Sequence, residues 1–137
     1  MLCLCDTDMK RRCRSKKAKR GTYVSKKSGQ TCRYRSNWER LYLEHLDSES
    51  NVLTYTYEPF FIHYVSNVRT GKLRKYIPDV LVTFIDSSQH LVEIKPKSRL
   101  SKRTVVKKIA AAQNWCLEHG LTYVIVTEHD LKSLGLL

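Results

Sequence analysis

Residues 77–95 read IPDVLVTFIDSSQHLVEIK, and this segment determines how the chain folds. Two apolar runs flank a turn-forming Asp-Ser-Ser, so we expect a strand over residues 79–85 and a second over residues 90–94. In such a hairpin the start of the first strand lies beside the end of the second. Asp79 begins the first strand and Glu93 ends the second, which predicts both carboxylates at one sheet edge. Lys95 follows Glu93 by two residues, and strand alternation places both side chains on the same face.

Two carboxylates and an ammonium group at one edge are suited to phosphodiester hydrolysis. Carboxylate oxygens bind Mg²⁺ or Mn²⁺, and the cation lowers the pKa of a bound water. A neighbouring lysine stabilises negative charge in the transition state. The alternative is structural: Asp79 lies in a surface turn, and Glu93 and Lys95 form an ordinary ion pair.

The flanking sequence predicts helices on both sides of this hairpin. Ser36 and Glu39 fit a capping box, the first as N-cap and the second at N3, which begins a helix. Pro96 ends the last strand of the hairpin, and Gly120 is well placed to end the helix that follows. The expected helices are 36–48, 101–119 and 129–134, and the further strands are 52–57, 60–65, 74–77 and 122–126. This αβββαβ order predicts an α/β fold, with a meander in a mixed sheet flanked by helices.

Positive charge is concentrated at the start of the chain. The 137 residues carry a formal net charge of +12, and residues 1–35, with twelve Lys or Arg and two Asp, account for +10. We therefore expect a flexible basic arm over residues 1–33, a domain over residues 34–137, and DNA as the polyanionic partner. A second basic group without acids follows the Glu93 strand, and the alternative for both groups is a solvated surface. The expected DNA-contact residues are Arg11, Arg12, Lys16, Lys17, Lys97, Arg99, Lys102, Arg103, Lys107 and Lys108.

Composition excludes several classes of protein. An apolar fraction of 42% is too high for a fully disordered chain, and no apolar run approaches the roughly 18 residues of a membrane helix. The N-terminus lacks the pattern of a secretory signal, so we expect a cytoplasmic setting, bacterial or in a phage-infected host. Five cysteines without a Cys-x2-Cys pair predict neither a disulfide scaffold nor a zinc site.

Around Asp79 and Glu93 the sequence resembles the PD-(D/E)xK nuclease superfamily, through Pro78-Asp79 and Glu93-Ile94-Lys95. More narrowly, it is similar to the N-terminal endonuclease domain of TnsA transposase subunits and to related phage nucleases of the head-completion type. The similar segments lie within residues 34–128. They are Ser36-x-Trp38-Glu39, Tyr57-Glu58-Pro59-Phe60, the run from Arg74 to Asp79, and Glu93-Ile94-Lys95-Pro96.

The resemblance implies a restriction-endonuclease-like fold and a Mg²⁺- or Mn²⁺-dependent DNA endonuclease, whose metal-activated water leaves 5′-phosphate and 3′-hydroxyl ends. It implies Asp79, Glu93 and the Ile94 carbonyl as metal ligands, Glu39 as a further ligand, and Lys95 as the catalytic lysine. A helix cap also explains Glu39 without a metal.

Two alternative functions stay open beside the endonuclease. One is a nuclease of phage head completion or DNA-end processing, and the other is a non-catalytic DNA-binding module that retains the fold. The expected partners are double-stranded DNA and either a second copy of the chain or recombination or phage proteins, because a single active site cuts one strand.

Overall fold

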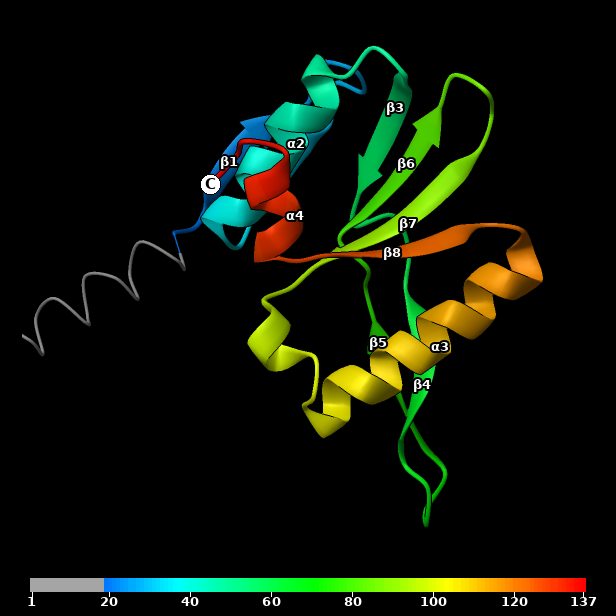
Figure 1. Cartoon of the computed structure of the whole chain (residues 1–137). Coiled ribbons are helices and arrows are strands. Elements are labelled where there is room, and N and C mark those ends of the chain that lie inside the picture. Colours follow the sequence, from blue (N-terminus) through cyan, green and yellow to red (C-terminus); the bar gives the residue numbers. More distant parts are fainter. Residues whose placement is uncertain (1–18) are drawn as a thin grey trace, which may run out of the picture.

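The computed structural model describes residues 19–137, which form a mixed α/β fold around a four-stranded sheet (Figure 1). The strands lie in the order β3 (Val52–Tyr57), β6 (Val80–Phe84), β7 (Gln89–Ile94) and β8 (Thr122–Val126). The first two pairings are antiparallel, and β7 pairs β8 in parallel. A parallel neighbour needs a long crossover, which η1 (Lys97–Arg99) and α3 (Arg103–His119) provide. The expected mixed sheet flanked by helices is confirmed.

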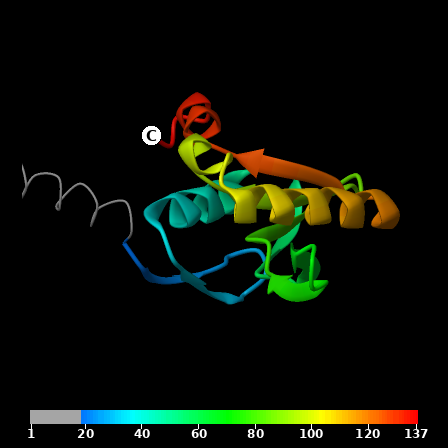
Figure 2. The ribbon, with the colours of Figure 1, turned by 90° about the horizontal axis from the view of Figure 1, so that it is seen from below.

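Helices cover both faces of this sheet (Figure 2). On one face, α2 (Asn37–Ser48) and α4 (Glu128–Ser133) bury Leu43 and Leu131 against strand residues such as Val92. On the other face, Cys116 of α3 packs in a second cluster with Leu91. Because neighbouring residues of a strand point to opposite faces, β7 contributes to both clusters.

The predicted helix ends are largely confirmed. The Ser36 side chain is the N-cap of α2 and accepts from the Glu39 amide at 3.3 Å. Gly120 ends α3 with φ 70°, a left-handed conformation that glycine adopts without strain. The other half of the predicted capping box is wrong, since the Glu39 carboxylate accepts from the Arg35 amide at 2.8 Å and not from the N-cap amide.

An N-terminal hairpin lies where the flexible arm was expected. It consists of β1 (Gly21–Val24) and β2 (Thr31–Tyr34). Cys32 of β2 is completely buried against the α2 side of the core, and Asp47 of α2 accepts hydrogen bonds from the Tyr23 hydroxyl and the Lys26 and Lys27 amides. The ordered domain therefore begins before residue 34. Four of the expected DNA-contact residues lie outside the described residues: Arg11, Arg12, Lys16 and Lys17.

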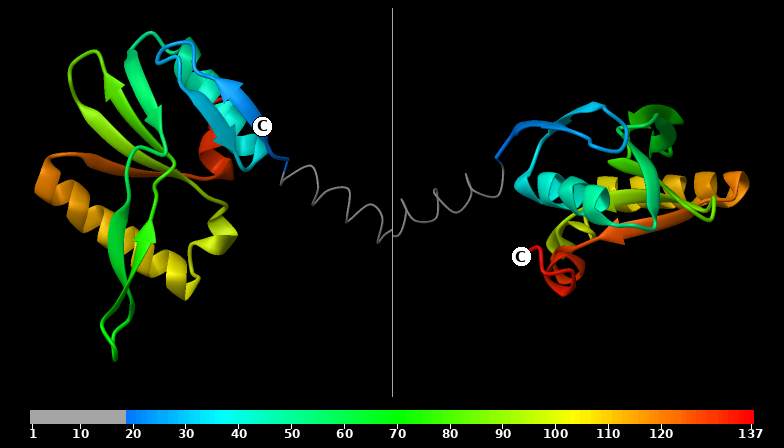
Figure 3. Two further views of the ribbon diagram at one scale, coloured as in Figure 1. Left: turned by 180° about the vertical axis from the view of Figure 1, so that it is seen from behind. Right: turned by 90° about the horizontal axis from the view of Figure 1, so that it is seen from above.

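The strands β4 (Ile62–Asn67) and β5 (Lys72–Tyr76) form a separate two-stranded ribbon, which differs from the expected meander. Glu58 has φ 47°, and Pro59 follows it, so the chain turns out of the sheet after β3. The strand β3 then pairs with β6 directly. The turn of the ribbon extends beyond α3, away from the four-stranded sheet (Figures 1 and 3).

The sequence predicts no membrane helix and no disulfide scaffold. No helix within residues 19–137 is both long enough and apolar enough to cross a membrane. Cys32 and Cys116 are buried free thiols.

Candidate active site

Asp79 and Glu93 lie side by side where β6 begins and β7 ends, as the hairpin pattern predicts, and we call this end of the two inner strands the sheet edge. The register pairs Val80 with Val92, so the preceding and following residues lie opposite each other. The Asp79 carboxylate accepts from the Ile94 amide at 2.7 Å. This hydrogen bond fixes the Asp79 side chain beside the end of β7.

Glu93 is buried and lies among polar side chains from β5, β8 and the end of β7. Its side chain is only 9% exposed, and its Oε2 accepts from the Tyr76 hydroxyl at 2.5 Å. The Tyr123 hydroxyl lies 3.1 Å from that of Tyr76. The Lys95 ammonium lies 3.4 Å from Glu93 Oε1, which confirms that the two residues share a face.

The surroundings of Asp79 and Glu93 raise the pKa values of both carboxyl groups. Burial, followed by the charges of Glu93 and Glu39, raises the pKa of Asp79 well above its usual range. Burial also raises the pKa of Glu93, against the hydrogen bond from Tyr76 and the charge of Lys95. The same causes, burial first and the Glu93 charge second, raise the pKa of Tyr76, which keeps its hydroxyl a donor.

Glu39 approaches this pair from α2. It is 8% exposed, and its Oε2 accepts from the Arg35 amide at 2.8 Å and from the Tyr57 hydroxyl at 3.0 Å. Its charge is close enough to affect Asp79. In the described part of the chain, however, no three Cys, His, Asp or Glu side chains are grouped to hold a metal ion. Glu39, Asp79 and Glu93 are therefore not a preassembled three-carboxylate site.

The Asp79 and Glu93 pair nevertheless fits a divalent cation. Within residues 19–137, the hydrogen bonds of Asp79 use only Oδ2 and leave Oδ1 for a ligand. Hard carboxylate oxygens are the donors that Mg²⁺ and Mn²⁺ prefer. A bound cation also supplies positive charge next to two carboxylates that repel each other.

Basic side chains extend from this edge along η1 and the start of α3. Four of them are exposed and form no ion pair with a described carboxylate: Lys97, Arg99, Lys102 and Arg103. The two remaining basic residues predicted to contact DNA, Lys107 and Lys108, contact the β4–β5 ribbon instead of facing solvent freely. Lys107 donates to the Ser66 carbonyl at 2.7 Å, and the Lys108 ammonium lies over the Tyr64 and Tyr76 rings.

Sequence reasoning did not find the tyrosines of the site. Tyr57 and Tyr76 donate to Glu39 and Glu93, and Glu58 donates its amide to the Asp79 carbonyl at 2.8 Å. Tyr57 and Tyr76 end the strands β3 and β5, and Glu58 directly follows Tyr57 in a segment that carries the family resemblance. The position of Tyr57 beside Glu58 in this segment could have pointed to Tyr57 as a residue of the site.

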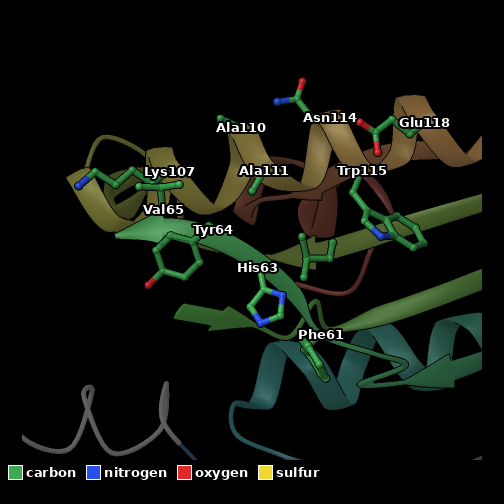
Figure 4. Close-up of a pocket in the computed structure, with 11 residues that line it drawn as sticks. Phe61, His63, Tyr64, Val65, Lys107, Ala110, Ala111, Asn114, Trp115 and Glu118 are labelled. Atoms are coloured by element: carbon green, nitrogen blue, oxygen red, sulfur yellow. The ribbon is translucent and has the colours of Figure 1, made fainter. Parts of the chain in front are cut away.

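The cavity of about 600 Å³ between β4 and α3 is a different feature (Figure 4). Its lining includes Phe61, His63, Lys107 and Trp115, and it includes neither of the paired carboxylates.

A mixed sheet with paired carboxylates and a lysine at one edge is the arrangement of a PD-(D/E)xK nuclease. Residues 49–128 match the TnsA-like endonuclease N-terminal family, and the chain belongs to that family. The chain is also 28% identical over 124 residues to the head completion nuclease of Enterobacteria phage T4, which covers 74% of this chain and 82% of that protein. The family match contains Asp79, Glu93 and Lys95 and begins after Glu39.

Proposed function

We propose that this nuclease-family protein is a metal-dependent DNA endonuclease whose active site is the edge formed by Asp79, Glu93 and Lys95. The observation that carries the proposal is the pair formed by the buried Glu93 and the half-buried Asp79, with raised pKa values and an adjacent ammonium group, inside the segment that matches the family. Perturbed carboxylates beside a cation are typical of functional sites.

Asp79, Glu93 and the Ile94 carbonyl hold Mg²⁺ or Mn²⁺ in this proposal, with Glu39 as a further ligand. When bound, the cation lowers the pKa of a water and neutralises charge on the phosphoryl oxygens. The Lys95 ammonium stabilises the negative charge that develops on the phosphoryl group. Tyr76 orients the Glu93 carboxylate through its hydrogen bond. The expected products carry 5′-phosphate and 3′-hydroxyl ends.

Double-stranded DNA is the proposed substrate. The exposed cations Lys97, Arg99, Lys102 and Arg103 follow directly on the strand that carries Glu93. Within residues 19–137 their side chains form no ion pair with a carboxylate, so a DNA phosphate is a suitable counter-charge. Such contacts are salt-sensitive and independent of sequence.

The T4 relative, named a head completion nuclease, favours a second candidate, a nuclease of phage head completion or DNA-end processing that acts in an infected host. One active site cuts one strand, so double-strand cleavage requires a second copy or a partner nuclease. A non-catalytic DNA-binding module is the remaining alternative, and complete Asp79, Glu93 and Lys95 argue against it.

The test uses supercoiled and linear DNA with Mg²⁺, with Mn²⁺ and with EDTA. We expect the wild type and the control Asp86→Asn, in an exposed turn, to cut only with metal. Asp79→Asn and Lys95→Ala should cut at least about 100-fold more slowly, since each removes a group that acts in the transition state. The products should be joined by DNA ligase without end repair.

Equal cutting by all four proteins would contradict the assignment of the site. Binding of DNA without cutting by the wild type would instead favour the non-catalytic module. Ends that ligase joins only after phosphorylation would contradict the proposed end chemistry.

A further inference from the structure

The β4–β5 ribbon, residues 62–76, is a strongly basic projection whose exposed cations have no role in the proposed site. It exposes four cations, and residues 59–78 contain no Asp or Glu. The four are Arg69, Lys72, Arg74 and Lys75.

These cations have no negative partner among the described residues. None forms an ion pair with a carboxylate of residues 19–137. Lys75 lies over the Phe61 ring, 4.5 Å from its centroid, which leaves its charge uncompensated. Four like charges on a narrow ribbon repel one another, so an anionic partner stabilises this surface.

The ribbon is attached to the candidate active site at its base. Tyr76, its last residue, donates to Glu93. Arg74 pairs with Tyr64, and strand alternation places it on the same face as Tyr76. From Tyr76 to the turn the ribbon spans about 15 Å at roughly 3.3 Å per residue.

The ribbon is also fixed to α3, so it holds a defined direction. Lys107 donates to the Ser66 carbonyl, at the point where the β4–β5 register shifts, and Lys108 lies over Tyr64 and Tyr76. Arg103 lies one helical turn before Lys107, so the basic start of α3 adjoins the point where the ribbon contacts this helix.

The tip of the ribbon is a tight turn with an exposed apolar side chain, which suits insertion into a groove of DNA. Asn67 Oδ1 accepts from the Arg69 amide at 3.0 Å, and Gly71 adopts φ 69°, so the turn is tight. Val68 at the tip is 82% exposed and Leu73 is 56% exposed. The major groove of DNA admits a two-stranded ribbon, and apolar tips contact base edges there.

We propose that the β4–β5 ribbon is a second DNA-contact element, which enters a groove of the duplex beside the site of cleavage. Arg69, Lys72 and Arg74 contact phosphates, and Val68 reaches the base edges. This inference rests on DNA as the substrate, and it adds a contact to those of the α3 stripe. A protein partner on the exposed Val65 and Leu73 side chains is the competing occupant, which the ribbon's positive charge disfavours.

The first test measures DNA affinity against salt for the full chain carrying Asp79→Asn, which separates binding from cutting. Arg69→Gln with Lys72→Gln should reduce the slope of log K against log salt by about 1.8, at about 0.9 for each phosphate contact. Affinity should fall about tenfold or more. Lys26→Gln with Lys132→Gln removes the same charge from exposed positions on the β1–β2 hairpin and α4, and should leave the slope unchanged.

The second test places a photocrosslinking residue, p-benzoylphenylalanine, at Val68 or at Leu117. Both positions are 82% exposed, and Leu117 lies near the far end of α3. We expect crosslinks to DNA from position 68 and few from position 117.

An unchanged slope in the ribbon variant, an equal loss in the control, or equal crosslinking at both positions would overturn the ribbon proposal. In that case metal-dependent cutting by the wild type would still support the proposed function. A wild type that neither binds nor cuts DNA overturns both.

Discussion

Replacing Tyr76 with phenylalanine tests whether the buried hydroxyl supports the site. Tyr76 is 5% exposed, so the ring packing of the phenylalanine stays the same and only the hydroxyl is lost. That hydroxyl donates to Glu93 Oε2 at 2.5 Å and lies 3.1 Å from the Tyr123 hydroxyl. The substitution therefore removes a hydrogen bond to a buried carboxylate.

The magnitude follows from the geometry. A hydrogen bond to a charged group contributes about 1.5–3 kcal/mol. The Tyr123 hydroxyl is close enough to replace part of it, so we expect the free energy of unfolding to fall by about 1–2 kcal/mol. For a domain of this size the Tm should fall by roughly 3–8 °C. Cleavage should slow about 10- to 100-fold, because Glu93 loses the group that orients it.

Urea unfolding and a plasmid-nicking assay measure the two effects. The matched control is Tyr42→Phe on α2, whose hydroxyl makes no hydrogen bond to another residue of the described chain. This control should change stability by less than about 0.5 kcal/mol and leave cleavage unchanged. If Tyr76→Phe cuts at the wild-type rate, the orienting role of Tyr76 is refuted, whatever its effect on stability.

Three further predictions concern the metal, pH and a helix end. Mg²⁺ at 100 times its Kd should stabilise the wild type and Asp86→Asn by about 2.7 kcal/mol, and Asp79→Asn much less, in a thermal melt with and without EDTA. Burial raises the pKa of Asp47, but hydrogen bonds from Tyr23 and two amides outweigh it and lower the pKa overall. Its contribution is therefore fully present above about pH 4 and is lost as the pH falls through the lowered pKa, so Asp47→Asn should reduce stability by about 1 kcal/mol at pH 7 and by progressively less below pH 4, as urea unfolding across pH would reveal. Gly120→Ala should cost about 1 kcal/mol in urea unfolding, because φ 70° disfavours a side chain; an unchanged midpoint would contradict this.

The sequence predicts the main elements because their signals are local. The β3 strand has the predicted bounds, Val52–Tyr57, and α3 ends at Gly120 as expected. The edge position of Asp79 and Glu93 follows from one tight hairpin and strand alternation. These features depend on neighbours within about fifteen residues of the chain.

Features that depend on distant contacts could not be predicted in the same way. The β1–β2 hairpin consists of two four-residue strands in a polar, basic segment, and its packing depends on Asp47, more than twenty residues away. The Tyr76 partner depends on how the ribbon sits against β7 and β8. The ribbon leaves the sheet after a positive φ at Glu58, and Pro59 predicts the break in the strand but not the direction in which the chain turns.

The most direct measurement of the central claim is the rate of plasmid nicking as a function of Mg²⁺ concentration, for the wild type and for Glu93→Gln. Glutamine keeps the size of the side chain and an oxygen that can accept from Tyr76, but it lacks the charge that a cation needs. The account predicts a rate that saturates with Mg²⁺ in the wild type and is reduced at least about 100-fold in Glu93→Gln at every concentration. Identical metal dependence and rate in the two proteins would contradict it.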